Sequence, residues 1–200
     1  MKVDVLLITY NQSEFIIQAL EGLLMQKVCD DLSVRVIIAD DCSSDSTIEI
    51  IRQYELKSPF SFVYLPNEKN LGHVLNYKRA FEICDADYVA ILEGDDWWCN
   101  PYHIQKHVDF LEEHRECVLS SSRPCIYDVN SQKYFMDYFP VEQKPLWYIS
   151  TEENIPWNKI TNLSTCVIRA SVLRKVINNE KLWSVDMIDW PLELMLSEYG

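Results

Sequence analysis

The segment VRVIIADDCSS, residues 34–44, is a run of aliphatic and β-branched residues that ends abruptly in two aspartates, a cysteine and two serines. A short apolar run bounded by polar residues is typical of a buried strand, so we predict a strand from Val34 to Ala39. The residues that follow place isoleucines at helical spacing, and Ser46 with Glu49 matches a capping box. The segment therefore predicts a strand followed by a helix.

The same strand-then-helix unit recurs on both sides of this segment. The predicted strands are 3–8, 62–65 and 88–92, and two of the predicted helices are about 13–26 and 74–84. A further helix is predicted after Asn100 and Pro101, because Asn100 matches an N-cap and Pro101 a first helical residue. Strands that alternate with helices form a mainly parallel sheet with helices on both faces. We therefore expect an α/β fold.

The second half of the chain is less regular. The predicted strands there are 118–121, 125–129 and 165–169, and the predicted helices are 171–178 and 190–199, the last begun by Pro191. The stretch 137–157 mixes prolines with aromatic residues and is expected to be irregular. Because no repeat, low-complexity tract or long linker divides the chain, residues 1–200 are expected to form one domain.

Composition argues against several classes of protein. The chain has 31 acidic and 18 basic residues and a formal charge of −13, which opposes binding to nucleic-acid phosphates. Its glycines stand at 22, 72, 94 and 200, a spacing that fits neither the G-x-G-x-x-G turn nor the G-x-x-x-x-G-K-[ST] loop. We expect no nucleic-acid partner and neither of these two nucleotide-binding loops.

The sequence also predicts where the protein resides. No window approaches the roughly 18 consecutive apolar residues of a membrane span. The N-terminus runs into polar sequence without a small-residue cleavage site, so no signal peptide is expected. The seven cysteines are odd in number and lack a C-x-x-C pair, which fits reduced thiols. A cytoplasmic location follows as the expectation.

Polar side chains follow all four predicted strands of the first hundred residues. Because ligands bind beyond the carboxyl ends of parallel strands, we expect these clusters to meet at one edge of the sheet. Asp95 and Asp96 follow the fourth strand, and two adjacent carboxylates repel each other unless a proton or a cation lies between them. Mg²⁺ takes carboxylate oxygens together with substrate phosphates. The pair therefore indicates a site for a metal and a diphosphate.

Taken in order, these clusters resemble the motifs of a known family. They are ITYN (8–11), ADDCSSD (39–45), NLG (70–72) and LEGDDWW (92–98), followed by DWP (189–191) at a predicted helix start. In this order and spacing they are similar to the motifs of the family 2 glycosyltransferases of the GT-A fold, whose central sheet is Rossmann-like and mainly parallel. The resemblance implies a nucleotide-sugar-binding half, residues 1–100, and an acceptor-side half, residues 101–200, with an irregular C-terminal part.

The resemblance also implies roles for individual residues. The residues implied to bind the nucleotide-sugar donor are Thr9, Tyr10, Asn11, Asp41, Asn70, Gly72, Lys78 and Asp95. Asp41 would pair with the base, and Lys78, Lys69 or Arg79 would add positive charge. Asp96 and Asp95 are the implied ligands of Mg²⁺ or Mn²⁺, and Asp189 is the implied general base. The metal motif reads Gly-Asp-Asp instead of Asp-x-Asp, which leaves open which of the two aspartates holds the metal.

The implied activity is transfer of a sugar, with inversion, from a nucleoside-diphosphate sugar to an acceptor hydroxyl. A UDP-sugar is the expected donor, and a saccharide or lipid-linked saccharide in polysaccharide or surface glycan synthesis is the expected acceptor. A metal ion would stabilise the leaving diphosphate while a carboxylate takes the proton of the attacking hydroxyl. Family members usually continue past Gly200, so we expect a C-terminally truncated chain, with peripheral association at the inner face of the membrane.

Two other classes of function stay open. A receiver-type phospho-acceptor domain also carries an acidic pocket after a strand, as Asp40 and Asp41 do here, although a complete strand-helix unit precedes them. A module that binds nucleotide sugars without turnover would keep the same motifs. Asp189 has the alternative role of capping the helix begun by Pro191. Trp97, directly after the acidic pair, is either a wall of the site or a core residue.

Overall fold

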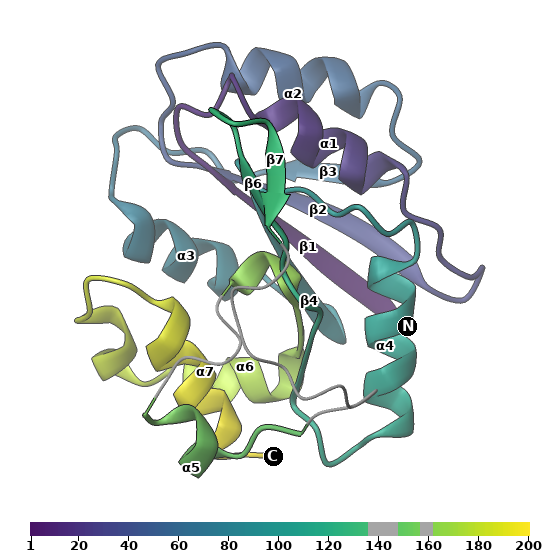
Figure 1. The fold of residues 1–200 in the computed structure, drawn as a ribbon. Coiled ribbons are helices and arrows are strands. Elements are labelled where there is room, and N and C mark those ends of the chain that lie inside the picture. Colours follow the sequence, from purple (N-terminus) through teal and green to yellow (C-terminus); the bar gives the residue numbers. More distant parts are fainter. Residues whose placement is uncertain (136–147, 157–161) are drawn as a thin grey trace.

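A six-stranded sheet forms the centre of the protein in this computed structural model, which describes residues 1–135, 148–156 and 162–200 (Figure 1). The strand order is β3–β2–β1–β4–β8–β5. The strands are β1 (Lys2–Thr9), β2 (Ser33–Asp40), β3 (Ser61–Tyr64), β4 (Tyr88–Glu93), β5 (Leu119–Ser121) and β8 (Cys166–Arg169). The first four run parallel, whereas β8 is antiparallel to both β4 and β5. The mainly parallel sheet predicted from the sequence is confirmed.

The strand order also decides against the receiver-type alternative. A receiver domain has the flavodoxin-like order 2-1-3-4-5 in a parallel sheet. Here β1 lies between β2 and β4, and the edge beyond β4 is built from two strands of the second half of the chain, β8 and β5. The receiver interpretation is therefore wrong.

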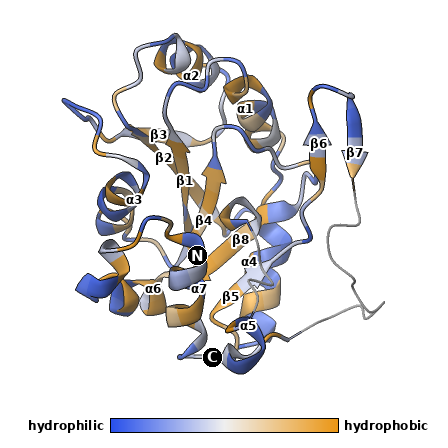
Figure 2. Ribbon diagram, turned by 60° about the vertical axis from the view of Figure 1, so that its left-hand side comes forward, coloured by the Kyte–Doolittle hydropathy of each residue, from blue (hydrophilic) through white to orange (hydrophobic). Residues whose placement is uncertain are grey.

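Helices cover both faces of the sheet, as predicted (Figures 1 and 2). One face carries α1 (Ile16–Leu24), α2 (Thr47–Glu55) and α4 (His103–Glu113), and the other carries α3 (His73–Glu82), α6 (Ala170–Val176) and α7 (Asp189–Ser197). Successive strand residues point to opposite faces, so Leu6 and Ile8 pack in one core cluster and Val5 and Leu7 in the other. The long apolar runs of the sequence are explained by this burial on both sides.

Three predicted helix starts differ from the structure. The Ser46 side chain makes no capping hydrogen bond, so the predicted capping box is absent, and Asp45 Oδ1 instead accepts a hydrogen bond from the Thr47 N–H. Helix α4 begins at His103, and Asn100 and Pro101 lie in the turn before it. Helix α7 begins at Asp189, two residues before Pro191. At α2 and α4 a side chain just before the helix, Asp45 or Asn100, accepts a backbone N–H of the turn.

The second half adds short elements around the edge of the sheet. A two-stranded hairpin pairs β6 (Ile126–Asp128) with β7 (Lys133–Phe135), of which only β6 was predicted. Helix α5 (Thr151–Asn154) has a Ser150–Glu153 capping box, and 3-10 turns span Leu163–Thr165 and Glu180–Trp183. Most of the stretch 137–157 that we expected to be irregular lies outside the described residues. No helix of the described residues is long and apolar enough to cross a bilayer.

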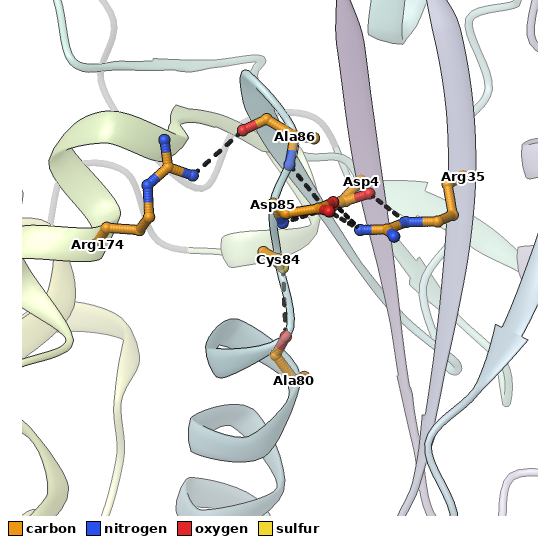
Figure 3. A network of polar contacts seen from close by, with 7 residues as sticks. All are labelled: Asp4, Arg35, Ala80, Cys84, Asp85, Ala86 and Arg174. Carbon is orange, nitrogen blue, oxygen red and sulfur yellow. Dashed lines mark hydrogen bonds and ion pairs between the residues drawn. The ribbon is translucent and has the colours of Figure 1, made fainter.

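A buried ion pair holds the amino-terminal end of the sheet together (Figure 3). Asp4 in β1 is 1% exposed, and its two oxygens accept hydrogen bonds from Nε and Nη2 of Arg35 in β2 at 2.8 Å. The same carboxylate accepts the N–H groups of Asp85 and Ala86, which precede β4. Because the charge is fully bonded, its burial is tolerated. The network lies at the opposite end of the strands from the clusters discussed next.

Candidate functional site

The carboxyl ends of the parallel strands bring the predicted clusters together. In the sheet Thr9 lies beside Asp40, and Ile8 lies beside Glu93. Past the strand ends, the Asp41 N–H donates to the Thr9 carbonyl and the Gly94 N–H donates to the Ile8 carbonyl, both at 2.9 Å. The sequence expectation that the clusters following β1, β2 and β4 share one edge is confirmed by these contacts.

A cavity of about 360 Å³ opens at this edge. Its lining residues are Ile8, Thr9, Tyr10, Gln12, Asp41, Asn70, Gly72, His73, Asn76 and Glu93. Five of the eight predicted donor residues are among them, namely Thr9, Tyr10, Asp41, Asn70 and Gly72. Sequence reasoning did not single out Gln12, His73, Asn76 or Glu93. For Glu93 a signal was present, because it opens the acidic cluster after β4.

Asp41 is the anchor of one cavity wall. It is 3% exposed, and its carboxylate accepts three hydrogen bonds from the loop before α3. The donors are Asn67 Nδ2 at 2.7 Å, the Leu71 N–H at 2.9 Å and the Gly72 N–H at 2.8 Å. Gly72 has a φ of 88°, a conformation that side-chain-bearing residues rarely adopt. Asp41 therefore shapes the loop that carries Asn70 and Gly72.

Three buried oxygens of cavity-lining residues have no hydrogen-bond partner among the described residues. They are Thr9 Oγ1, Gln12 Oε1 and Asn76 Oδ1, and Thr9 and Asn76 are 2% and 1% exposed. The other end of the Asn76 amide is fixed, because its Nδ2 donates to the Ala39 carbonyl at 2.7 Å. A buried polar atom without a partner is costly. Hydroxyl or N–H groups of a bound ligand would supply the missing donors.

Gly94 is closely packed against side chains that line the cavity. A Cβ at this position would lie 2.4 Å from Gln12 Oε1 and 3.0 Å from Thr9 Oγ1. Any side chain would displace two polar groups next to the cavity. This explains the glycine between Glu93 and Asp95 without a requirement for unusual backbone angles.

Asn11 joins the loops that follow β1 and β2. Its φ is 51°, a left-handed conformation that asparagine tolerates better than most residues. Its N–H donates to Ser43 Oγ and its Oδ1 accepts the Ser44 N–H, both at 2.8 Å. Asn11 is not among the cavity-lining residues, whereas its neighbour Tyr10 lines the cavity and is 46% exposed.

The acidic pair, Asp95 and Asp96, is not among the cavity-lining residues but closely follows Glu93, which is. Asn162 Nδ2, from the turn that precedes β8, donates to Asp96 Oδ2 at 2.9 Å. The pKa of Asp95 is raised, first by loss of solvent around the carboxyl and then by the neighbouring Asp96 charge. Among the described residues no group of three His, Cys, Asp or Glu side chains forms a complete metal site. A cation here would take two protein carboxylates and need further oxygens from a ligand.

Glu93 is the most strongly perturbed acid of the site. Burial, together with the charges of Asp189 and Asp96, raises its pKa to about 8, whereas the hydrogen bond from Tyr77 opposes the shift. Tyr77 Oη donates to Glu93 Oε1 at 3.0 Å from a fully buried position in α3. Near neutral pH this carboxyl is largely protonated, so the site holds less negative charge than its acidic residues suggest.

Asp189 reaches the site from the other end of the chain. It is the first residue of α7, and the capping position belongs to Ile188, so the interpretation of Asp189 as the N-cap is wrong. Its Oδ1 is buried without a partner among the described residues. Burial raises the pKa of Asp189, and the charges of Asp96 (raising) and His73 (lowering) act on it as well. The structure therefore brings Asp189, Asp96 and His73 within electrostatic range of one another.

Lys78 and Arg79 of α3 are not among the cavity-lining residues. Lys78 Nζ lies 3.6 Å from Glu180 Oε2 and 5.5 Å from the centre of the Trp183 ring. Arg79 donates to the Pro66 carbonyl. At about 100° per residue, Lys78 faces away from His73 and Asn76, which line the cavity. The expectation that Lys78 contacts the donor is therefore not supported by its position.

The chain matches a known protein family and several curated relatives. The family model described as glycosyl transferase family 2 matches residues 4–177. Among curated relatives, the uncharacterised protein Rv1520 of Mycobacterium tuberculosis is 38% identical over 112 residues, which cover 56% of this chain and 32% of that protein. The putative teichuronic acid biosynthesis glycosyltransferase TuaG of Bacillus subtilis is 34% identical over 119 residues, 59% of this chain and 44% of TuaG. The chain thus spans less than half the length of these relatives.

Solved structures share the fold. The crystal structure of Staphylococcus aureus TarS 1–349 in complex with UDP matches with a TM-score of 0.65 and 21% identity, over 98% of this chain and 56% of TarS. The mannosyltransferase PcManGT of Pyrobaculum calidifontis, in complex with GDP-Man and Mn²⁺, matches with a TM-score of 0.61 and 17% identity, over 87% of this chain and 46% of that one. At these identities the similarity establishes the architecture.

Proposed function

The chain belongs to glycosyl transferase family 2, and from this premise we propose that it transfers a sugar from a nucleoside-diphosphate sugar to an acceptor hydroxyl with inversion at the anomeric carbon. The observation that carries the proposal is a cavity with Asp41 in one wall and Glu93 in its lining, next to the acidic pair that follows β4. The matches cover 32% of Rv1520 and 44% of TuaG, so the activity of the whole protein is a proposal.

The cavity suits a nucleotide. Its volume of about 360 Å³ lies within the range of small-molecule sites. Thr9 Oγ1 and Asn76 Oδ1 offer acceptors for the hydroxyl and N–H groups of a nucleoside, and Tyr10 offers an exposed ring for stacking. Asp41 would accept the N–H of the base. We favour UDP because TarS was crystallised with UDP and with UDP-GlcNAc, and a GDP-sugar as in PcManGT is the competing donor.

The acidic pair fits Mg²⁺ or Mn²⁺. Asp95 and Asp96 present hard oxygen ligands, and a counter-ion would offset the loss of solvent and the Asp96 charge that raise the pKa of Asp95. When bound, the cation would offset charge on the leaving diphosphate. Asn162 orients Asp96 through its hydrogen bond, so the carboxylate is positioned before any ligand arrives.

Asp189 is the proposed general base. Its free Oδ1 would accept the proton of the acceptor hydroxyl as that oxygen attacks the anomeric carbon. Attack from the side opposite the leaving diphosphate inverts the centre in one displacement. The raised pKa of Asp189 makes it a better proton acceptor, because burial disfavours its charged form.

We further propose a place in polysaccharide or surface glycan synthesis, with a saccharide or lipid-linked saccharide as acceptor. The support is the similarity to TuaG, which is named a putative teichuronic acid biosynthesis glycosyltransferase. Such acceptors fit a cytoplasmic protein that associates with the inner face of the membrane.

The test is ligand-induced stabilisation followed by turnover. UDP at 100 times its Kd should add about 2.7 kcal/mol to the free energy of unfolding. We expect Mn²⁺ to strengthen UDP binding, Asp96→Ala to abolish that increment, and the exposed control Asp30→Ala to leave it intact. Equal metal dependence in wild type and Asp96→Ala would overturn the assignment. Slow metal-dependent hydrolysis of UDP-sugars without acceptor would distinguish an enzyme from a binding module.

A further inference from the structure

The β6–β7 hairpin leaves the sheet beside the acidic pair. Strand β5 is antiparallel to β8, which is antiparallel to β4, so β5 ends at the same edge as β4. Directly after β5, the Ser122 N–H donates to the Thr165 carbonyl at 3.1 Å. Thr165 belongs to the 3-10 turn that follows Asn162, the residue bonded to Asp96. The hairpin therefore arises from the rim of the site.

Three aromatic rings run from the site onto this hairpin, and we call Trp97, Tyr127 and Tyr134 the aromatic strip. Trp97 directly follows Asp96, and its ring centre lies 5.9 Å from that of Tyr127. Tyr127 and Tyr134 are cross-strand partners with ring centres 4.9 Å apart. Contacts of this kind form a continuous path of rings that begins next to the acidic pair.

The strip changes from half-buried Trp97 and Tyr127 to exposed Tyr134, and folding does not account for this exposed end. Neither tyrosine belongs to the two core clusters, and Tyr134 is 61% exposed. All three residues of β7 are exposed, and the hairpin projects from the body of the protein (Figure 2). Two strands of three residues contribute little stability by themselves. Exposed apolar side chains that gather beside a site are typical of a binding surface.

We propose that the aromatic strip binds pyranose rings of a saccharide acceptor next to the sugar unit that is glycosylated; this inference rests on the proposed function. The C–H faces of pyranoses pack on aromatic faces, and phenol hydroxyls can exchange hydrogen bonds with sugar hydroxyls. The strip begins one residue from Asp96, so a chain held along it would present its end to the reacting centre.

The charge of the hairpin favours a neutral saccharide over a phosphate-rich polymer. Residues 126–135 contain one acid, Asp128, and one base, Lys133. The Asp128 carboxylate is bonded within its own turn by the Asn130 N–H and the Ser131 hydroxyl. A polyanion would need a cluster of cations, which this hairpin lacks in its sequence.

The test measures binding of defined hexasaccharides in the presence of UDP and Mn²⁺. Cellohexaose, chitohexaose and maltohexaose are titrated by calorimetry, and we expect saturable binding of at least one. Tyr134→Ser should weaken that binding roughly tenfold, and Tyr134→Phe should change it less than about twofold, because the ring is retained. Phe135→Ser is the matched control, since Phe135 is 50% exposed and pairs with Ile126 on the opposite face of the same hairpin.

Several outcomes would overturn the proposal. One is no saturable binding of any hexasaccharide by a protein that still binds UDP, and another is an equal loss in Phe135→Ser and Tyr134→Ser. A third is a substitution in the strip that changes the sedimentation mass of the protein but leaves hexasaccharide binding unchanged. That result would identify the strip as a self-association surface. UDP affinity is measured in every variant. Loss of UDP binding would count against the proposed function, whereas loss of hexasaccharide binding alone concerns the aromatic strip. Melting temperatures confirm that each variant is folded.

Discussion

Asn162 donates a hydrogen bond from Nδ2 to Oδ2 of Asp96 across 2.9 Å, which joins the turn before β8 to the acidic pair after β4. The same side chain accepts the Ser164 N–H on Oδ1, so its amide is held from both ends. Ser164 in turn accepts the Glu93 N–H on its hydroxyl, and its carbonyl accepts the indole N–H of Trp98. Residues 66 positions apart thus set the orientation of one carboxylate.

The first prediction concerns this orientation. Asn162→Leu removes the donor at similar volume, and a lost hydrogen bond to a charged group should weaken the Mn²⁺-dependent part of UDP binding roughly tenfold. UDP binding without metal should change little. Calorimetry with and without Mn²⁺ provides the measurement, with Asn178→Leu in an exposed position as the control. An unchanged metal increment would show that Asn162 only supports the turn.

The second prediction separates two roles of Asp41. Asp41→Ala removes three hydrogen bonds to the 67–72 loop, so it should destabilise the protein by about 1 to 3 kcal/mol and weaken every nucleotide. If the carboxylate also accepts the base N–H, UDP should lose more affinity than CDP, whose ring lacks that N–H. Urea denaturation and calorimetry give the two quantities. Equal losses for UDP and CDP would assign Asp41 to the loop alone.

The third prediction concerns Asp189. Because Asp189 is not the helix cap and its Oδ1 lacks a partner among the described residues, Asp189→Asn should preserve the melting temperature and UDP binding. An amide cannot take a proton, so sugar transfer should fall by roughly 10² to 10⁴. The measurement needs a saccharide acceptor, with both transfer rates and melting curves recorded. An active variant would remove Asp189 from the mechanism.

The fourth prediction is acid sensitivity from two buried histidines of α4. Burial lowers the pKa of His103 to about 3, with His107 adding to the shift, and burial lowers the pKa of His107 to about 4. Both start from 6.5 in the unfolded chain, so the unfolded state binds more protons below that pH. Stability is therefore retained above pH 6.5 and falls below it, down to about pH 3 to 4.

The slope of this loss should be up to about 1.4 kcal/mol per pH unit for each histidine. His103→Phe keeps a ring against Trp98, whose ring centre lies 4.6 Å away, and it removes one titrating group. We expect a shallower fall of the free energy of unfolding between pH 6.5 and 4, measured by urea denaturation. His114→Gln at the end of α4 is the control, and equal slopes in wild type and His103→Phe would contradict the prediction.

The sequence by itself determined the layers of the fold and one edge of the site. Apolar runs such as Val34–Ala39 are local, and the polar residues after them occur at strand ends, so parallel pairing necessarily places Thr9, Asp41 and Asp95 at one edge. The ordered motifs were sufficient to indicate the family. The strands, the polar residues that follow them and the ordered motifs depend on neighbours along the chain. They can therefore be inferred from the sequence alone.

Only the tertiary structure decided how the rest of the molecule completes that edge. The antiparallel strands β8 and β5 and the bond from Asn162 to Asp96 join segments far apart in sequence, which no local period encodes. The orientation of α3 places His73 in the cavity lining, whereas Lys78 lies near Glu180 on another face of the helix. Glu93 acquires its raised pKa through burial and distant charges. Burial, orientation and electrostatic coupling are properties of the packed chain, because they depend on which distant atoms replace water around each group.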